Sequence, residues 1–75
     1  QEYDPEYFET VRVFLDSNQN YKQTSDILFV HPKTVRYRIE KIKELTQLDF
    51  DNPDEMLQVM IGIRISQLLG NYNKD

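Results

Sequence analysis

The sequence predicts an all-α fold, a small four-helix domain. Only two glycines, Gly62 and Gly70, occur in the 75 residues, and this scarcity disfavours the tight turns that β-hairpins need. Helix-start signals recur along the chain, and apolar residues follow them at helical spacing. The chain is short enough to form one domain, residues 1–75. Without cysteine, its stability must come from helix packing.

The first predicted helix spans residues 5–18. Asp4 can cap its N-terminus, and Pro5 suits the first helical position. The helix should end near Asn18, within a polar run. The residues that repeat at helical spacing are Phe8, Val11, Phe14 and Leu15.

The second predicted helix, residues 21–28, is short. Asn20 is a good N-cap, and Gln23 stands three residues later, as in a capping box. Ser25 is small, which would let another helix approach closely. The side chains expected to face inward are Ile27 and Leu28.

The third predicted helix spans residues 32–45 and begins at Pro32, with His31 at the cap position. One apolar stripe runs along it: Val35, Ile39, Ile42 and Leu45. Only residues 29–31 separate it from the second helix. Two helices joined by so short a turn form a helix-turn-helix.

The fourth predicted helix spans residues 53–69. Asn52 supplies the cap, Glu55 follows three residues later, and Gly70 suits a left-handed stop. Apolar residues cover well over half its circumference, whereas an ordinary surface helix needs a stripe of about 100°. Two interpretations remain open. In the first, the helix is sandwiched between the first helix and the loop at residues 48–50. We expect this loop to fold onto the core through Leu48 and Phe50. In the second, one side of the helix contacts a second copy of the chain.

Positive charge is concentrated on the third predicted helix. Residues 31–43 hold five of the nine basic residues and one of the thirteen acidic residues, a net charge of +4, while the rest of the chain carries −8. This separation makes the helix a candidate for contact with a polyanion, of which DNA is the obvious one.

In a helix-turn-helix, the N-terminal residues of the second helix enter the major groove of DNA. Basic side chains there suit the guanine edge, and a tyrosine can stack or reach a phosphate. The helix N-terminus also offers free N–H groups to a phosphate. We therefore assign these residues to a surface that binds double-stranded DNA: Lys33, Thr34, Arg36, Tyr37, Arg38, Lys41, His31, Tyr21 and Lys22.

Several of these residues have a structural alternative. Arg38 lies beside the apolar stripe and could pair with Asp26, Tyr37 could pack on a neighbouring lysine, and His31 is a cap or phosphate contact rather than a catalytic base. The alternative function is a protein–protein interaction module that presents the basic helix to an acidic partner without nucleic acid. Salt-dependent DNA binding separates the two. RNA binding is disfavoured because no aromatic stacking platform is evident.

No pattern in the sequence indicates catalysis. A phosphate-binding glycine loop, a metalloprotease motif, a calcium loop and a nucleophile elbow are all missing. We therefore expect no enzyme activity, catalytic residue, metal or cofactor. No apolar run approaches the roughly 20 residues of a membrane span, and the lack of cysteine fits a cytoplasmic location.

The string Thr-Val-Arg-Tyr-Arg-Ile from Thr34 to Ile39, with the helix and turn before it, resembles the C-terminal helix-turn-helix of the PucR/CdaR family of bacterial transcription regulators. The resemblance covers residues 8–69, and the Fis-type DNA-binding domain is a more distant likeness. Lys33 stands where the family usually has Asn, and Gln47 replaces a helix-ending Gly. The resemblance implies a sequence-specific DNA-binding output domain at the C-terminus of a longer, ligand-sensing regulator, and dimeric binding to an operator.

Overall fold

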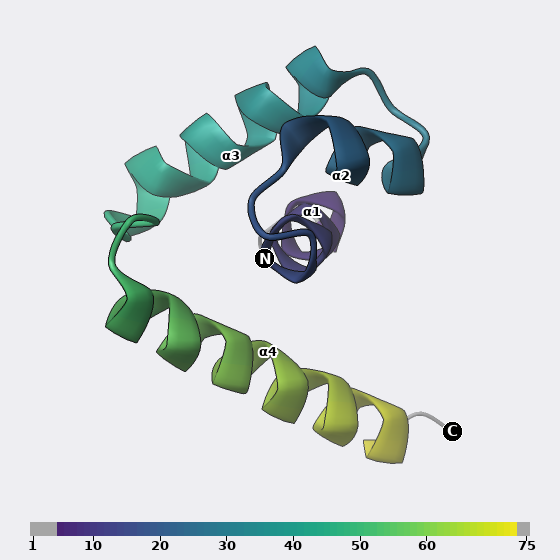
Figure 1. The fold of residues 1–75 in the computed structure, drawn as a ribbon. Helices are drawn as coiled ribbons and strands as arrows, with labels where there is room; N and C mark the ends of the chain where they lie inside the picture. The colour runs from purple at the N-terminus through teal and green to yellow at the C-terminus, as the bar shows by residue number, and fades with distance from the viewer. Residues whose placement is uncertain (1–4, 74–75) are drawn as a thin grey trace.

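The computed structural model describes residues 5–73, with side chains described for residues 5–70 (Figure 1). In chain order the helices are α1 (Pro5–Asp16), α2 (Tyr21–Leu28), α3 (Pro32–Thr46) and α4 (Pro53–Asn73). No strand occurs in the described part of the chain, so the predicted all-α, four-helix fold class is confirmed. α1 lies at the centre, with α2 and α3 on one side of it and α4 on the other (Figure 1).

The core surrounds α1. Phe14 of α1 is 2% exposed, and Val35 and Ile39 of α3 are both 0% exposed. The ring centroid of Phe14 lies 4.9 Å from that of Tyr21 and 6.1 Å from that of Phe50, so aromatic contacts join α1 to α2 and to the loop before α4. The predicted burial of Val35, Ile39 and Phe50 is confirmed.

α1 ends at Asp16, two residues before the expected end at Asn18. Asn18 and Gln19 have φ angles of 56° and 60°, in the left-handed region, and a right-handed helix cannot continue through them. The side-chain amide of Gln19 donates to the carbonyl of Phe50 at 2.8 Å, which ties this turn to the loop before α4. The expected cap at Asp4 lies outside the described residues.

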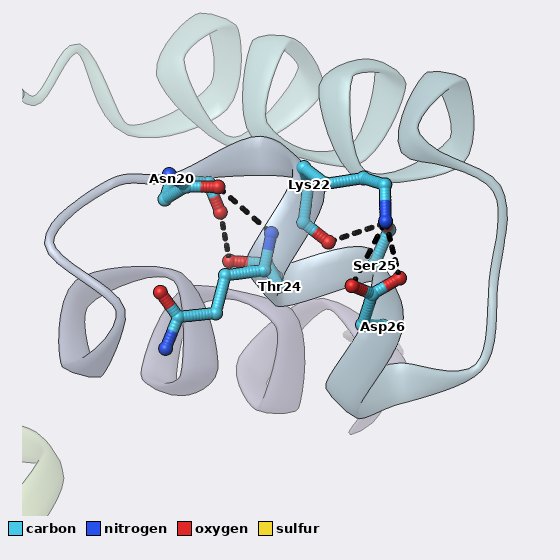
Figure 2. Close-up of polar contacts among 6 residues, drawn as sticks. Asn20, Lys22, Thr24, Ser25 and Asp26 are labelled. Atoms are coloured by element: carbon cyan, nitrogen blue, oxygen red, sulfur yellow. Dashed lines mark hydrogen bonds and ion pairs between the residues drawn. The ribbon is translucent and has the colours of Figure 1, made fainter.

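The N-cap of α2 is confirmed. Asn20 Oδ1 accepts a hydrogen bond from the backbone N–H of Gln23 at 2.8 Å (Figure 2). The N–H of Asn20 donates to the carbonyl of Ser17 at 3.1 Å rather than to the Gln23 side chain. The motif is therefore a simple cap and not the reciprocal capping box.

The inner side of α2 is formed by two small polar residues, Thr24 and Ser25, which are 0% and 2% exposed. Both hydroxyls donate at 2.7 Å to backbone carbonyls three or four residues earlier, so neither is buried without a partner (Figure 2). The expectation that Ile27 faces inward is wrong, because Ile27 is 50% exposed; Leu28 is half-buried. Helical periodicity identifies the buried side of a helix from its apolar residues. The buried side of α2 is formed by residues with hydroxyl groups, so the sequence pattern did not reveal it.

The apolar stripe of α3 is buried only as far as Ile42, which is 8% exposed. The expectation that Leu45 belongs to the core is wrong, because Leu45 is 72% exposed. The last turn of α3 extends beyond α2, toward the start of α4 (Figure 1). Periodicity therefore placed Leu45 on the correct side of the helix, but at a level where no other helix covers it.

α3 ends at Thr46, and the next residue, Gln47, has a φ of 63° and donates its N–H to the carbonyl of Lys43 at 2.8 Å. This is the left-handed helix end that glycine normally occupies. A side chain in this conformation brings its Cβ too close to the backbone, and glycine avoids that cost.

We expect Gln47→Gly to raise the free energy of unfolding by about 0.5–1 kcal/mol, less than the full left-handed penalty because glycine also makes the unfolded chain more flexible. Thermal melting followed by circular dichroism measures the change. The matched control is Gln58→Gly on the exposed side of α4, which should lower the free energy of unfolding by about 1 kcal/mol. A Gln47→Gly protein that melts below the wild type would contradict the prediction.

Asn52 caps α4, as predicted. Its Oδ1 accepts hydrogen bonds from the N–H groups of Asp54 at 2.9 Å and Glu55 at 3.2 Å. Glu55 Oε1 accepts from the N–H of Asp49 at 2.9 Å, so this carboxylate holds the loop instead of completing a capping box. α4 continues through Gly70, and no glycine in the described chain has a positive φ. The expected left-handed stop at Gly70 is therefore wrong.

α4 packs on α1 and makes no comparable contact with α2 or α3. Its inner side includes Met56 and Ile63, which are 7% and 8% exposed. The opposite side carries large apolar residues that are 50–69% exposed: Leu57, Ile61, Ile65, Leu68 and Leu69. The interpretation of α4 as a sandwiched helix is therefore wrong, while a contact with a second copy remains a prediction. None of the described helices has the length and apolar character needed to cross a membrane.

Candidate nucleic-acid interface

α3 presents its basic side chains away from α1, because its apolar stripe holds the other side in the core. Lys33 and Arg36 are exposed, and Tyr37 is 59% exposed. Thr34, beside them, is half-buried. The structure therefore brings these four predicted site residues together on the N-terminal half of α3.

The first turn of α3 has already used its backbone donors. Pro32 has no N–H, and the N–H of Lys33 donates to His31 Nδ1 at 3.0 Å. The N–H groups of Thr34 and Val35 donate to the carbonyl of His31 at 2.9 Å and 3.3 Å. The expectation of free N–H groups for a phosphate is therefore wrong. His31 is confirmed as the cap, and because its Nδ1 accepts, the neutral ring carries its hydrogen on Nε2.

Arg36 is held by Tyr21 across the helix-turn-helix. The guanidinium carbon of Arg36 lies 4.2 Å from the centroid of the Tyr21 ring, within cation–π range. Tyr21 is half-buried, and its ring packs against Phe14 in the core. The core thus fixes Tyr21, and Tyr21 in turn orients Arg36. Both residues were assigned to the site from sequence, but their contact depends on the angle between α2 and α3, which the sequence did not reveal.

Arg38 contacts α1 instead of facing outward. Its two terminal nitrogens donate to Thr10 Oγ1 at 3.1 Å and to Glu6 Oε1 at 3.2 Å, and its side chain is only 16% exposed. The suggested pairing of Arg38 with Asp26 is wrong. Asp26 instead pairs with Lys22 at 3.0 Å, one turn away on α2 (Figure 2). Arg38 therefore ties α3 to α1, through partners that sequence reasoning missed because they lie about 30 residues away.

We expect Arg38→Ala to lower the free energy of unfolding by about 1 kcal/mol, because it removes hydrogen bonds to the buried Thr10 hydroxyl and to a carboxylate. Urea denaturation measures the change. The matched control is Lys22→Ala, which breaks only an exposed pair within α2 and should cost about 0.3–0.5 kcal/mol. Equal losses for the two variants would contradict a tying role for Arg38.

Charge is balanced in one half of α3 and unbalanced in the other. The second half contains lysine–carboxylate pairs with nitrogen–oxygen distances of 3.7 Å: Lys41–Glu44 and Lys43–Glu40. Within residues 5–73, neither Lys33 nor Arg36 has an ion-pair partner. The uncompensated positive charge of α3 is therefore concentrated in its first two turns.

Comparison with known proteins agrees with this geometry. Residues 7–65 match the PucR C-terminal helix-turn-helix domain. The chain is similar to an uncharacterised protein of Haemophilus influenzae, with 38% identity over 55 residues that cover 73% of this chain and 15% of that protein. It is 29% identical over 69 residues to the purine catabolism regulatory protein of Bacillus subtilis, covering 92% of this chain and 13% of the relative. It is 33% identical over 58 residues to the carbohydrate diacid regulator of Escherichia coli, covering 77% and 15%.

No solved structure matches this chain significantly. The chain spans only 13–15% of the length of these three relatives. The family match extends from α1 through most of α4 and includes the whole helix-turn-helix. The resemblance inferred from the recognition-helix string is therefore confirmed, and this chain belongs to the PucR family of transcription regulators, as a C-terminal helix-turn-helix domain.

Proposed function

We propose that this domain binds duplex DNA sequence-specifically, with α3 in the major groove. The observation that carries the proposal is that Lys33 and Arg36 are both exposed cations without ion-pair partners among the described residues. They project from the part of a helix-turn-helix that reads base edges. The family match, and two relatives whose names identify them as regulators, support this function.

The site residues divide into four groups in this proposal. Lys33 and Arg36 read guanine edges, and Thr34 and Tyr37 contact neighbouring bases or the sugar–phosphate backbone. The residues that meet phosphates are Lys41, His31 and Lys22. The residues that position others are Tyr21, which orients Arg36, and Arg38, which holds α3 on α1.

We further propose that the chain is the C-terminal output module of a longer, ligand-sensing cytoplasmic regulator that binds its operator as a homodimer. The small share of each relative that it spans supports a modular role. A dimer presents two recognition helices to successive major grooves about 34 Å apart, which multiplies a weak single-site affinity.

Fluorescence anisotropy of labelled duplexes, random and promoter-derived, tests DNA binding at several salt concentrations. Non-specific binding should have a dissociation constant of about 10⁻⁴–10⁻⁶ M at physiological salt and should weaken as salt rises. Preference for one promoter duplex over the random one supports sequence-specific binding. No binding to any duplex at low salt would reject the proposal and favour the rival function, an acidic protein partner for α3.

Lys41→Ala should reduce the slope of the logarithm of the binding constant against the logarithm of salt concentration by about 1, because one phosphate contact is lost. A DNA phosphate would replace Glu44 as the partner of Lys41 in the complex. The matched control is Arg12→Ala, which removes a cation from α1 that pairs with Glu9 and Asp16 and should leave the slope unchanged. An unchanged slope for Lys41→Ala removes that residue from the interface.

A further inference from the structure

The outward side of α4 carries a stripe of exposed apolar side chains. Its members recur at spacings of four, four and three residues and are 50–69% exposed: Leu57, Ile61, Ile65 and Leu68. The stripe lies opposite the inner side of α4, which includes the buried Met56 and Ile63. In Figure 1, no other described element lies on the outward side of α4.

Charged residues are almost absent from this stretch. Between Met56 and Gly70 the only charged residue is Arg64, whereas charged residues make up 29% of the whole chain. Arg64 lies 3.5 Å from Asp16 of α1. Single exposed leucines are ordinary on a protein surface, but a contiguous apolar side marks a surface that another molecule covers.

Gly62 borders this stripe, in the middle of α4. A Cβ atom at Gly62 would meet nothing within 4 Å, and the residue does not have a positive φ. The fold of this chain therefore does not require glycine at Gly62, where alanine would make a more stable helix. A missing side chain at an exposed position lets a second helix approach closely.

We propose that the outward side of α4 binds the same side of a second copy of this chain, with the two helices antiparallel. Charge determines where two copies can touch and in which direction their helices run. The chain carries a net charge of −4, so two copies repel each other over most of their surfaces, but the stripe itself bears no carboxylate.

The antiparallel direction follows from two charges beside the stripe, Asp54 before its start and Arg64 between Ile61 and Ile65. Suppose that the two-fold axis relating the copies passes at the level of Ile61. Because an α-helix rises 1.5 Å per residue, Asp54 of one helix is then displaced by about 6 Å, measured along the helix axis, from Arg64 of the other. A parallel pair would place Asp54 beside Asp54 and Arg64 beside Arg64. The antiparallel pair therefore brings opposite charges together, while Leu57 of one copy faces Ile65 of the other.

The size of the stripe sets the strength of this contact. From Leu57 to Leu68 the helix advances about 17 Å, so one pair of such helices buries less than the roughly 800 Å² per partner of a standard interface. The dimer is therefore weak and depends on protein concentration. It leaves the DNA-facing side of α3 uncovered, because α3 and α4 lie on opposite sides of α1 (Figure 1). The proposal does not depend on DNA binding.

Sedimentation velocity over a wide range of protein concentrations tests the contact. The wild-type sedimentation coefficient should rise with concentration toward that of a dimer, and Ile61→Glu should weaken association by about tenfold or more, because it would bury a carboxylate in an apolar contact. The matched control is Leu45→Glu, which changes another exposed leucine outside the stripe and should associate like the wild type. Circular dichroism verifies that both variants fold. A wild type that stays monomeric at the highest concentration, or an Ile61→Glu protein that associates normally, overturns the proposal.

Cross-linking tests the direction of the helices, because the chain has no cysteine of its own. A mixture of Leu57→Cys and Ile65→Cys chains, treated with a short thiol-reactive cross-linker, should give mainly the mixed dimer. Either variant alone should cross-link poorly. Efficient cross-linking of each variant with itself, and not with the other, would overturn the antiparallel arrangement.

Discussion

Replacing Ile39 with alanine is expected to lower the free energy of unfolding by about 2–5 kcal/mol, because the side chain is entirely buried and its loss leaves a cavity. Ile39 lies in the middle of the α3 stripe, beside Val35 and within one core cluster with Phe14. These contacts fix the angle at which α3 lies on α1. Losing them therefore weakens both the fold and the surface proposed to bind DNA.

The loss is large relative to the stability of so small a domain. Folded domains are typically more stable than their unfolded states by about 5–15 kcal/mol, and a short chain lies toward the lower end of that range. In a domain of 60–100 residues, each 1 kcal/mol shifts the melting temperature by about 4–8 °C. A substantial fraction of the Ile39→Ala protein should therefore be unfolded at physiological temperature.

Thermal and urea unfolding, followed by circular dichroism, measure this effect. The matched control is Ile61→Ala, the same change at a half-exposed isoleucine of α4, studied at a concentration where the chain is monomeric. It should cost less than about 1 kcal/mol, because it removes little buried surface and creates no cavity. Similar losses for the two variants would show that Ile39 does not occupy the core position described here.

Arg36→Ala is expected to weaken binding to the specific site by about 1–3 kcal/mol, or roughly 5-fold to 160-fold, and to relax the preference for one base pair. The guanidinium of Arg36 has no ion-pair partner among the described residues, and the Tyr21 ring restricts its orientation. Such restriction reduces the side-chain entropy lost on binding, which favours a bidentate contact with a guanine edge.

Binding to a promoter duplex, and to a series with each base pair replaced in turn, separates base reading from phosphate contact. Arg36→Lys should recover part of the overall affinity but not the base preference, because a lysine lacks the planar fork that matches guanine. Arg12→Ala on α1 is again the control and should change neither quantity. If Arg36→Ala weakens binding equally on every duplex, Arg36 contacts the backbone rather than a base.

Local interactions made the helix starts predictable from the sequence. Asn20, His31 and Asn52 each accept a hydrogen bond from an N–H two or three residues later, so the whole interaction lies within one short stretch of sequence. The tight turn before α3 and the separation of its basic and apolar sides are equally local properties. They were sufficient to predict the fold class and the helix-turn-helix, whose second helix carries the candidate site.

Contacts between distant residues could not be predicted in this way. Arg38 was expected to meet DNA or Asp26, but it bonds to Glu6 and Thr10 of α1. Tyr21 was assigned to the DNA-binding surface, but its contacts with Phe14 and Arg36 could not be read from the sequence. Each of these partnerships depends on how one helix crosses another, and helix crossings are set by the packing of the whole core.

Burial at the helix ends and on α4 could not be predicted from the sequence for the same reason. Leu45 lies on the apolar stripe of α3 yet is exposed, and Ile27 is exposed while two hydroxyl residues of α2 are buried. On α4, apolar residues lie on every side, so periodicity could not identify the side that packs on α1. Helical spacing determines which residues share a side of a helix. Which side is covered, and along how much of its length, depends on where the neighbouring helices lie.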